Sequence, residues 1–201
     1  MALIKLNDRA VSNATTFGSI SSLGEMVFIS KATASASASI EFTSGIDSTY
    51  KEYVFYFYDI HPSIDDAYFG FNMSTDGGSN YNVTKTTTAV GAYLSEANQD
   101  AEVIYQASQD LAQSTLYQKL LGSLGNENDE NGVGYLHLFN PSSSVFVKHF
   151  ISTTNGVHQQ PANSNRYIAG YGNTTSPVNA IRFQMESGNI DAGEILLFGI
   201  N

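Results

Sequence analysis

The stretch EYVFYFYDI, residues 52–60, decides the fold class of this chain. From Tyr53 to Tyr58 every side chain is aromatic or β-branched, so both faces of an extended segment would be apolar. Apolar side chains on both faces are typical of a central strand that is buried on each side or covered by a neighbouring subunit. The stretch therefore predicts an interior strand of a β-sheet, with an all-β protein around it.

Shorter segments on either side of this stretch repeat the pattern of a strand. Their apolar side chains alternate with polar ones, and clusters of Gly, Asn, Asp, Ser and Pro separate them, as in strands joined by turns. We predict about nine strands in all. Besides residues 52–60, the clearest segments are residues 37–43, 69–73, 81–88, 133–139, 145–152, 181–185 and 194–200.

Three turns between these segments predict β-hairpins. Glycine tolerates the positive φ angles of tight turns, and proline ends a hydrogen-bonded ladder. Each predicted turn would join the strand before it to the strand after it. The three turns are Asp76-Gly77-Gly78, Asn140-Pro141-Ser142 and Ser187-Gly188-Asn189.

The length of 201 residues suits one domain. Residues 1–23 are polar with spaced apolar side chains, and we expect an N-terminal arm that anchors the protein by adding a strand to a neighbour's sheet. Residues 24–201 are expected to form an antiparallel β-sandwich of jelly-roll type. At most one short helix is expected, at residues 110–121, where helix formers compete with Ser114 and Thr115 and a strand or loop is equally open.

Composition excludes several classes of partner. Nineteen acidic against nine basic residues give a net charge of -10, which opposes binding to nucleic acid. The chain has no Cys, which argues against a disulfide scaffold and thiol chemistry. The first 17 residues lack the apolar core of a signal peptide, and no stretch approaches the ~18 to 20 apolar residues of a membrane span. We therefore expect neither export by a classical signal nor membrane insertion.

No catalytic motif is visible in the sequence. There is no G-x-S-x-G elbow to supply a nucleophilic triad, and the histidines are scattered. His137 and His149 fall on opposing strands of a predicted hairpin and could be cross-strand neighbours, but two histidines without a third ligand more often pack than bind metal. We predict no catalytic, cofactor-binding or metal-ligating residue. The four histidines are His61, His137, His149 and His158.

Residues 126–132, NENDENG, are the densest acidic segment. Four of them match the first, third, fifth and sixth positions of a calcium-loop spacing, namely Glu127, Asp129, Asn131 and Gly132. Position twelve is Leu138 where a bidentate Glu is needed, and the segment leads into a predicted strand, so a solvated surface loop is favoured over a calcium site. The acidic turns at Asp65-Asp66 and Asp76 are better explained by turn chemistry than as a glycosidase pair.

Seven tyrosines crowd into residues 50–93. Tyrosine is favoured at interfaces because it joins a large apolar body to a polar tip. A plain aromatic core explains at least half of them, and the others favour subunit contacts. Sugar stacking is a further interpretation, weakened by the absence of Trp. The tyrosines are Tyr50, Tyr53, Tyr56, Tyr58, Tyr68, Tyr81 and Tyr93.

Five longer strings carry a resemblance to a known family. They are SIEFTSGIDSTYKEYVFYFYDIHPS (residues 39–63), YQASQDLAQSTLYQ (105–118), LFNPSSSVFVKHF (138–150), AGYGNTT (169–175) and SGNIDAGEILLFGI (187–200). With these strings the chain resembles an uncharacterised family of virion structural proteins from marine tailed bacteriophages, including those that infect cyanobacteria. The resemblance implies a particle component and carries over no site residue.

Together these observations predict a non-enzymatic virion structural protein, displayed on the particle surface as a homo-oligomer, with a trimer as one option. Its partners would be other copies and other virion proteins, in a capsid decoration or spike or in a tail fibre or other tail component. One alternative is a tail adhesin domain that binds a host receptor or surface glycan. Another is a glycan depolymerase, which predicts a cleft with two carboxylates in acid/base geometry.

Overall fold

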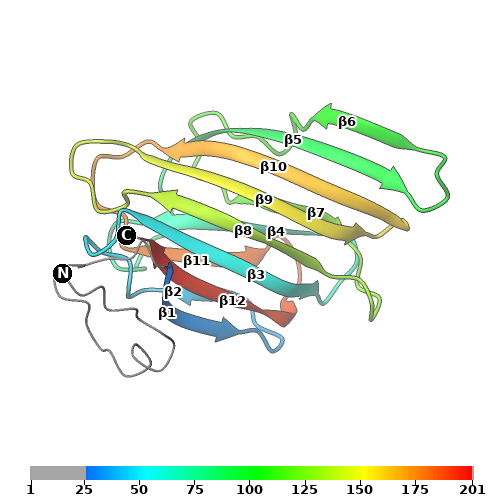
Figure 1. The fold of residues 1–201 in the computed structure, drawn as a ribbon, viewed down its shortest axis with the longest axis horizontal. Helices are drawn as coiled ribbons and strands as arrows, with labels where there is room; N and C mark the ends of the chain where they lie inside the picture. Colours follow the sequence, from blue (N-terminus) through cyan, green and yellow to red (C-terminus); the bar gives the residue numbers. More distant parts are fainter. Residues whose placement is uncertain (1–25, 201) are drawn as a thin grey trace, which may run out of the picture.

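A computed structural model describes residues 26–200, and in this range the chain forms twelve strands and no helix (Figure 1). Accordingly, no helix in residues 26–200 is available to cross a membrane. The predicted arm, residues 1–23, lies outside the described residues. The strands are β1 (Met26–Thr33), β2 (Ile40–Phe42), β3 (Glu52–Pro62), β4 (Ala67–Ser74), β5 (Lys85–Ser95), β6 (Ala101–Tyr105), β7 (Gln118–Leu124), β8 (Gly132–Phe139), β9 (Lys148–His158), β10 (Ala162–Gly172), β11 (Ala180–Met185) and β12 (Ile190–Ile200).

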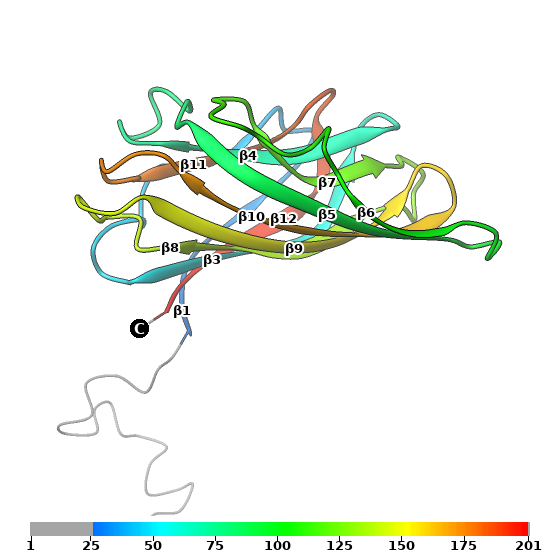
Figure 2. The same ribbon diagram turned by 90° about the horizontal axis from the view of Figure 1, so that it is seen from above.

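Antiparallel pairing joins all twelve strands into one sheet. Eight of them follow the order β1-β12-β3-β8-β9-β10-β5-β6, and the other four follow the order β7-β4-β11-β2. The two groups meet where Leu124 of β7 pairs with His158 of β9. Figure 2 shows the two groups lying one over the other, so that the sheet is nearly closed into a barrel. The all-β, antiparallel part of the prediction is confirmed, and the pairing does not by itself assign the jelly-roll type.

Strand β3 is the central strand that the sequence predicts. It lies between β12 and β8, with Phe55 opposite Leu197 on one side and Leu136 on the other. Phe55 and Phe57 point into the core and are fully buried, whereas Tyr58 on the opposite face is exposed. One apolar face of β3 is therefore covered by the core, and the other lies on the outer surface of the eight-strand group.

Phe183 of β11 is the centre of the core between the two strand groups. It stacks on Phe69 with 5.7 Å between ring centroids and meets the ring of Phe57 at a steep angle at 5.3 Å. Offset and edge-to-face pairs of this kind add about 0.5 to 1.5 kcal/mol each beyond the burial of apolar area. The other rings in contact with Phe183 are those of Phe42, Phe55 and Phe71.

Of the three predicted hairpins, only that of β8 and β9 is confirmed, with Leu138 opposite Phe150. Strand β4 pairs with β7 and β11 instead of β5, and β11 pairs with β2 and β4 instead of β12. The glycine turns do form, with φ of 73° at Gly77 and 70° at Gly188, but each carries the chain from the four-strand group to the eight-strand group. A turn reverses the chain locally, and burial of the inner faces decides which strand becomes the partner.

Residues 110–121, where a short helix was one option, form a loop and the start of β7. The backbone amide of Thr87 donates to the carbonyl of Leu111 at 2.8 Å. Backbone groups of Lys85 and Ser114 form a two-way pair at 2.7 and 3.0 Å. These hydrogen bonds hold the loop in an extended form along β5, so the helix option is wrong.

Candidate functional site

The outer face of the eight-strand group carries a row of aromatic side chains. Phe28 of β1 packs against Phe198 of β12 with 5.6 Å between ring centroids, Phe198 against Tyr56 of β3 at 5.8 Å, and Tyr56 against Tyr135 of β8 at 6.2 Å. We call these four residues the aromatic row. Phe28 is 54% exposed, so the row begins at the surface.

Apolar side chains extend this surface across the remaining strands. Ile151 of β9 and Tyr167 of β10 are each 50% exposed, and Tyr167 lies opposite the exposed Val90 of β5. The outer face of an antiparallel sheet is usually polar. An exposed apolar surface of this kind typically marks an interaction site.

The ionisable groups on this outer face contact each other. Lys31 lies 2.6 Å from Glu194, and both side chains come from strands β1 and β12 at one edge. His137 of β8 contacts the carboxylate of Glu52 on β3. The face therefore presents rings and aliphatic groups with little unpaired charge, although the protein as a whole carries a net charge of -10.

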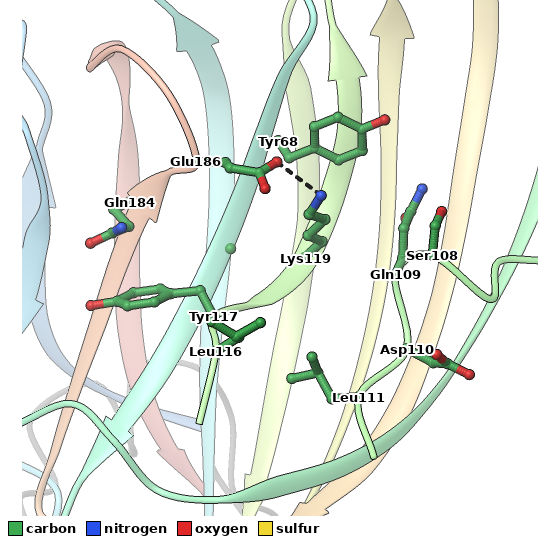
Figure 3. A pocket seen from close by; sticks show the side chains of 11 residues that line it. Tyr68, Ser108, Gln109, Asp110, Leu111, Leu116, Tyr117, Lys119, Gln184 and Glu186 are labelled. Carbon is green, nitrogen blue, oxygen red and sulfur yellow. Dashed lines mark ion pairs between the residues drawn. The ribbon is translucent and has the colours of Figure 1, made fainter. Parts of the chain in front are cut away.

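A pocket of about 350 Å³ opens on the outer face of the four-strand group, beside the loop that connects β6 to β7 (Figure 3). Lys119 of β7 stands between two of its walls, with Nζ 4.1 Å from the centroid of the Tyr68 ring and 2.9 Å from the carboxylate of Glu186. The lining residues are Tyr68, Gly70, Ser108, Gln109, Asp110, Leu111, Leu116, Tyr117, Lys119, Gln184 and Glu186.

The chemistry of this pocket suits an uncharged polar ligand. Rings such as Tyr68 and Tyr117 offer apolar faces, and Gln109 and Gln184 offer both donors and acceptors. The two carboxylates are already engaged, because Glu186 pairs with Lys119 and Asp110 accepts a hydrogen bond from the Tyr105 hydroxyl at 2.5 Å.

Two lysines of the eight-strand group are buried without a carboxylate partner among residues 26–200. Lys85 Nζ donates to Asn72 Oδ1 at 2.6 Å and to the carbonyl of Val83 at 2.8 Å. Burial lowers the pKa of Lys85 to about 7 and also lowers the pKa of Lys148. Sequence reasoning missed both, since nothing in the pattern KTTT at residues 85–88 distinguishes an inward lysine from a surface one.

The structure separates the predicted histidine pair. His137 lies opposite Ile151 rather than His149, and His149 packs beside Tyr171 instead. The expectation that His137 and His149 are direct cross-strand neighbours is therefore wrong. Among residues 26–200 no three His, Asp or Glu side chains gather where a metal ion could be held.

The acidic segment 126–131 forms the exposed turn between β7 and β8, as predicted. Its side chains close that turn, because Glu130 Oε2 accepts a hydrogen bond from the backbone amide of Glu127 at 2.8 Å. Asp76 serves its own turn in the same way. Ser74 Oγ donates to its carboxylate at 2.6 Å, and this bond, followed by those from Asn80, holds the pKa of Asp76 at about 2.

The predicted tyrosine cluster does not form one surface. Tyr53 is fully buried and bonds to Asp47, Tyr56 lies in the aromatic row, Tyr68 lines the pocket of Figure 3, and Tyr93 packs against His158. The other members of the aromatic row come from distant parts of the chain. Alternation within each strand marks them as outward residues, but only the strand order brings them together.

Comparison with protein-family models, curated proteins and solved structures finds no match for this chain. What the protein does is therefore inferred from its own surfaces.

Proposed function

We propose that this protein is a non-enzymatic structural component of a bacteriophage particle, displayed on the virion surface as a homo-oligomer. The observation that carries the proposal is the exposed, charge-poor face that runs from Phe28 to Tyr167 across the eight-strand group. The resemblance to phage virion proteins supports the particle as the setting. In this proposal the two strand groups are the layers of a jelly-roll sandwich, an architecture shared by many capsid proteins.

The extent of the face is sufficient for a stable contact. Seven spacings of about 4.8 Å separate its eight strands, and strands of 11 residues such as β3 and β10 are roughly 35 Å long. The face therefore covers on the order of 1,000 Å², against about 800 Å² per partner in a typical stable complex. A second copy of the chain would bury the rings that one copy leaves exposed.

The charge distribution favours self-association through this face. Acidic surfaces of two copies repel each other elsewhere, whereas here Lys31 is paired with Glu194 and His137 with Glu52 within one chain. Selection of a foreign partner by charge would need unpaired charges of one sign. The outer face is therefore suited to apolar contact with the identical face of a second copy.

Sedimentation velocity of the full chain tests this proposal. We expect the wild-type protein to be an oligomer, and Tyr167→Glu to weaken association by at least about tenfold, because it buries an unpaired charge in the contact. Phe146→Glu is the matched control, since Phe146 is 68% exposed on the loop between β8 and β9, away from the sheet face. A wild type that stays monomeric at high concentration, or a folded Tyr167→Glu variant of unchanged mass, contradicts the proposal.

A second candidate function, a glycan-binding adhesin domain, is favoured by the pocket of Figure 3. Its two tyrosine rings and two glutamine amides match the apolar faces and hydroxyl groups of a neutral sugar. We expect neutral glycans to be retained on an array by the wild-type protein and lost with Tyr117→Ala. A blank array, or unchanged binding by the variant, removes this candidate.

A further inference from the structure

The inner face of β10 holds two buried polar groups that find no partner among residues 26–200. Arg166 is 6% exposed and its Nε has no hydrogen-bond acceptor, and Ser164 Oγ is equally without a partner. The two residues are separated by one position on the strand, roughly 7 Å apart on one face. A buried guanidinium without a counter-charge is costly, which makes this end of the sheet suited to a group that supplies acceptor atoms.

Two glycines keep the space around the guanidinium. Gly91 of β5 lies directly opposite Arg166, and a side chain there would collide with Nη1. A Cβ at Gly122 of β7 would lie only 3.3 Å from Nη2. The backbones of β5 and β7 can therefore lie close to the guanidinium.

Arg166 lines an open groove of about 450 Å³ at the end of the eight-strand group. One wall is formed by Tyr93 and His158, whose rings meet edge to face at 5.4 Å. Burial lowers the pKa of His158, and the positive charge of Arg166 lowers it further, which favours the neutral imidazole. The lining residues are Tyr93, Asp100, Ala101, Glu102, Gln106, His158, Gln160 and Arg166.

The acidic residues of the groove do not neutralise Arg166. Asp100 directly precedes β6, and Glu102 is the second residue of that strand. Among residues 26–200, neither carboxylate forms an ion pair with the Arg166 guanidinium. They therefore add negative charge to the rim while the positive charge stays at the floor. A dianion would be repelled by this rim more strongly than a monoanion.

We propose that this groove binds an acidic sugar through its carboxylate, with Arg166 as the carboxylate-binding residue. The planar fork of a guanidinium matches a carboxylate with two parallel hydrogen bonds. Gln106 and Gln160 supply amides for sugar hydroxyls, and the Tyr93 ring supplies an apolar surface. The groove lies on the inner side of the sheet, so its occupation is independent of self-association through the outer face.

Isothermal titration calorimetry of the full chain with monomeric galacturonate, a monoanion, tests this inference. We expect saturable binding of galacturonate by the wild type, no binding of the matched neutral sugar galactose, and at least tenfold weaker binding of galacturonate by Arg166→Met. Arg182→Met is the matched control, because Arg182 is an arginine of the four-strand group that pairs with Glu41, and this variant should bind like the wild type.

Binding by a second variant and binding of inorganic phosphate also test the inference. Gln160→Ala, at an exposed position, should weaken binding even if Arg166→Met proves unstable. Absence of wild-type binding, or full binding by a folded Arg166→Met variant, overturns the inference. Inorganic phosphate that binds more tightly than galacturonate overturns the assignment of a sugar carboxylate.

Discussion

Lys85 makes the stability of this protein depend on pH in a window where ordinary lysines do not titrate. Its ammonium group is fully buried, and its pKa is lowered from 10.5 to about 7 by burial. Its two acceptors, Asn72 Oδ1 and the Val83 carbonyl, match the two N–H donors of a neutral amine. The folded protein therefore holds Lys85 uncharged above pH 7, while the unfolded chain keeps it charged to about pH 10.5.

The direction in which stability changes with pH follows from the number of protons that each state binds. Between pH 7 and 10.5 the unfolded chain binds more protons at this residue than the folded protein, so the free energy of unfolding rises with pH. The contribution of neutral Lys85 is full above pH 10.5 and is lost as the pH falls through about 7. With a limiting slope of 1.36 kcal/mol per pH unit, the rise from pH 7 to pH 9 is about 2 kcal/mol.

Urea unfolding at pH 7 and pH 9 measures this rise, with circular dichroism and tyrosine fluorescence as probes because the chain has no Trp. Lys85→Met keeps the length of the side chain and removes the titration, so we expect most of the gain of about 2 kcal/mol to disappear. Lys51→Met is the control, since Lys51 is exposed. An equal gain in wild type and Lys85→Met, or a wild type that loses stability toward pH 9, refutes the reasoning.

Two further predictions concern a buried lysine and a strained glycine. Lys148 Nζ donates to the carbonyls of Ser143, Phe146 and Thr174 at 2.6 to 3.2 Å. Lys148→Met should therefore lower the free energy of unfolding by about 2 kcal/mol and speed amide hydrogen exchange in residues 141–147. Unchanged protection of these amides would contradict a role of Lys148 in holding the loop. Gly134 has φ of 151°, and a Cβ would lie 2.5 Å from the Thr153 carbonyl oxygen. Gly134→Ala should therefore lower the free energy of unfolding by at least about 2 kcal/mol. Gly77 has φ of 73° but open space around it, so Gly77→Ala should lower the free energy of unfolding by only about 1 kcal/mol. Equal losses in urea melts would show that space at Gly134 is unimportant.

Local patterns accounted for the central strand, one hairpin and one turn. Residues 52–60 form the central strand, and the turn that begins at Asn140 leads from β8 to β9 as predicted, although β9 begins at Lys148 and not at Val145. The turn chemistry of Asp76 was also predicted correctly. These features depend on side-chain alternation and on φ angles within a few residues, which a sequence displays directly.

The candidate sites were harder to predict from the sequence than the strands were. Tyr56 and Tyr58 stood out in the sequence, but Phe28 and Phe198 join Tyr56 only because β1 pairs with β12 and β12 with β3. Arg166 sits in an unremarkable polar stretch, and its burial depends on the packing of β5 and β7 around β10. Side chains contributed by distant segments leave no local pattern.

The sequence by itself determined that the chain beyond its first 23 residues would form an antiparallel β protein with a strand buried at its centre, because alternation and turn residues act over short distances. Only the tertiary structure decided that β4 and β11 pair with each other in the four-strand group. Strands β5 and β12 each pair with other strands of the eight-strand group. The physical reason is that stacking one strand group on the other buries Phe71 against Phe150 of β9 and Phe183 against Phe57 of β3. A turn of two glycines constrains the path of the chain but not the strand on which it packs.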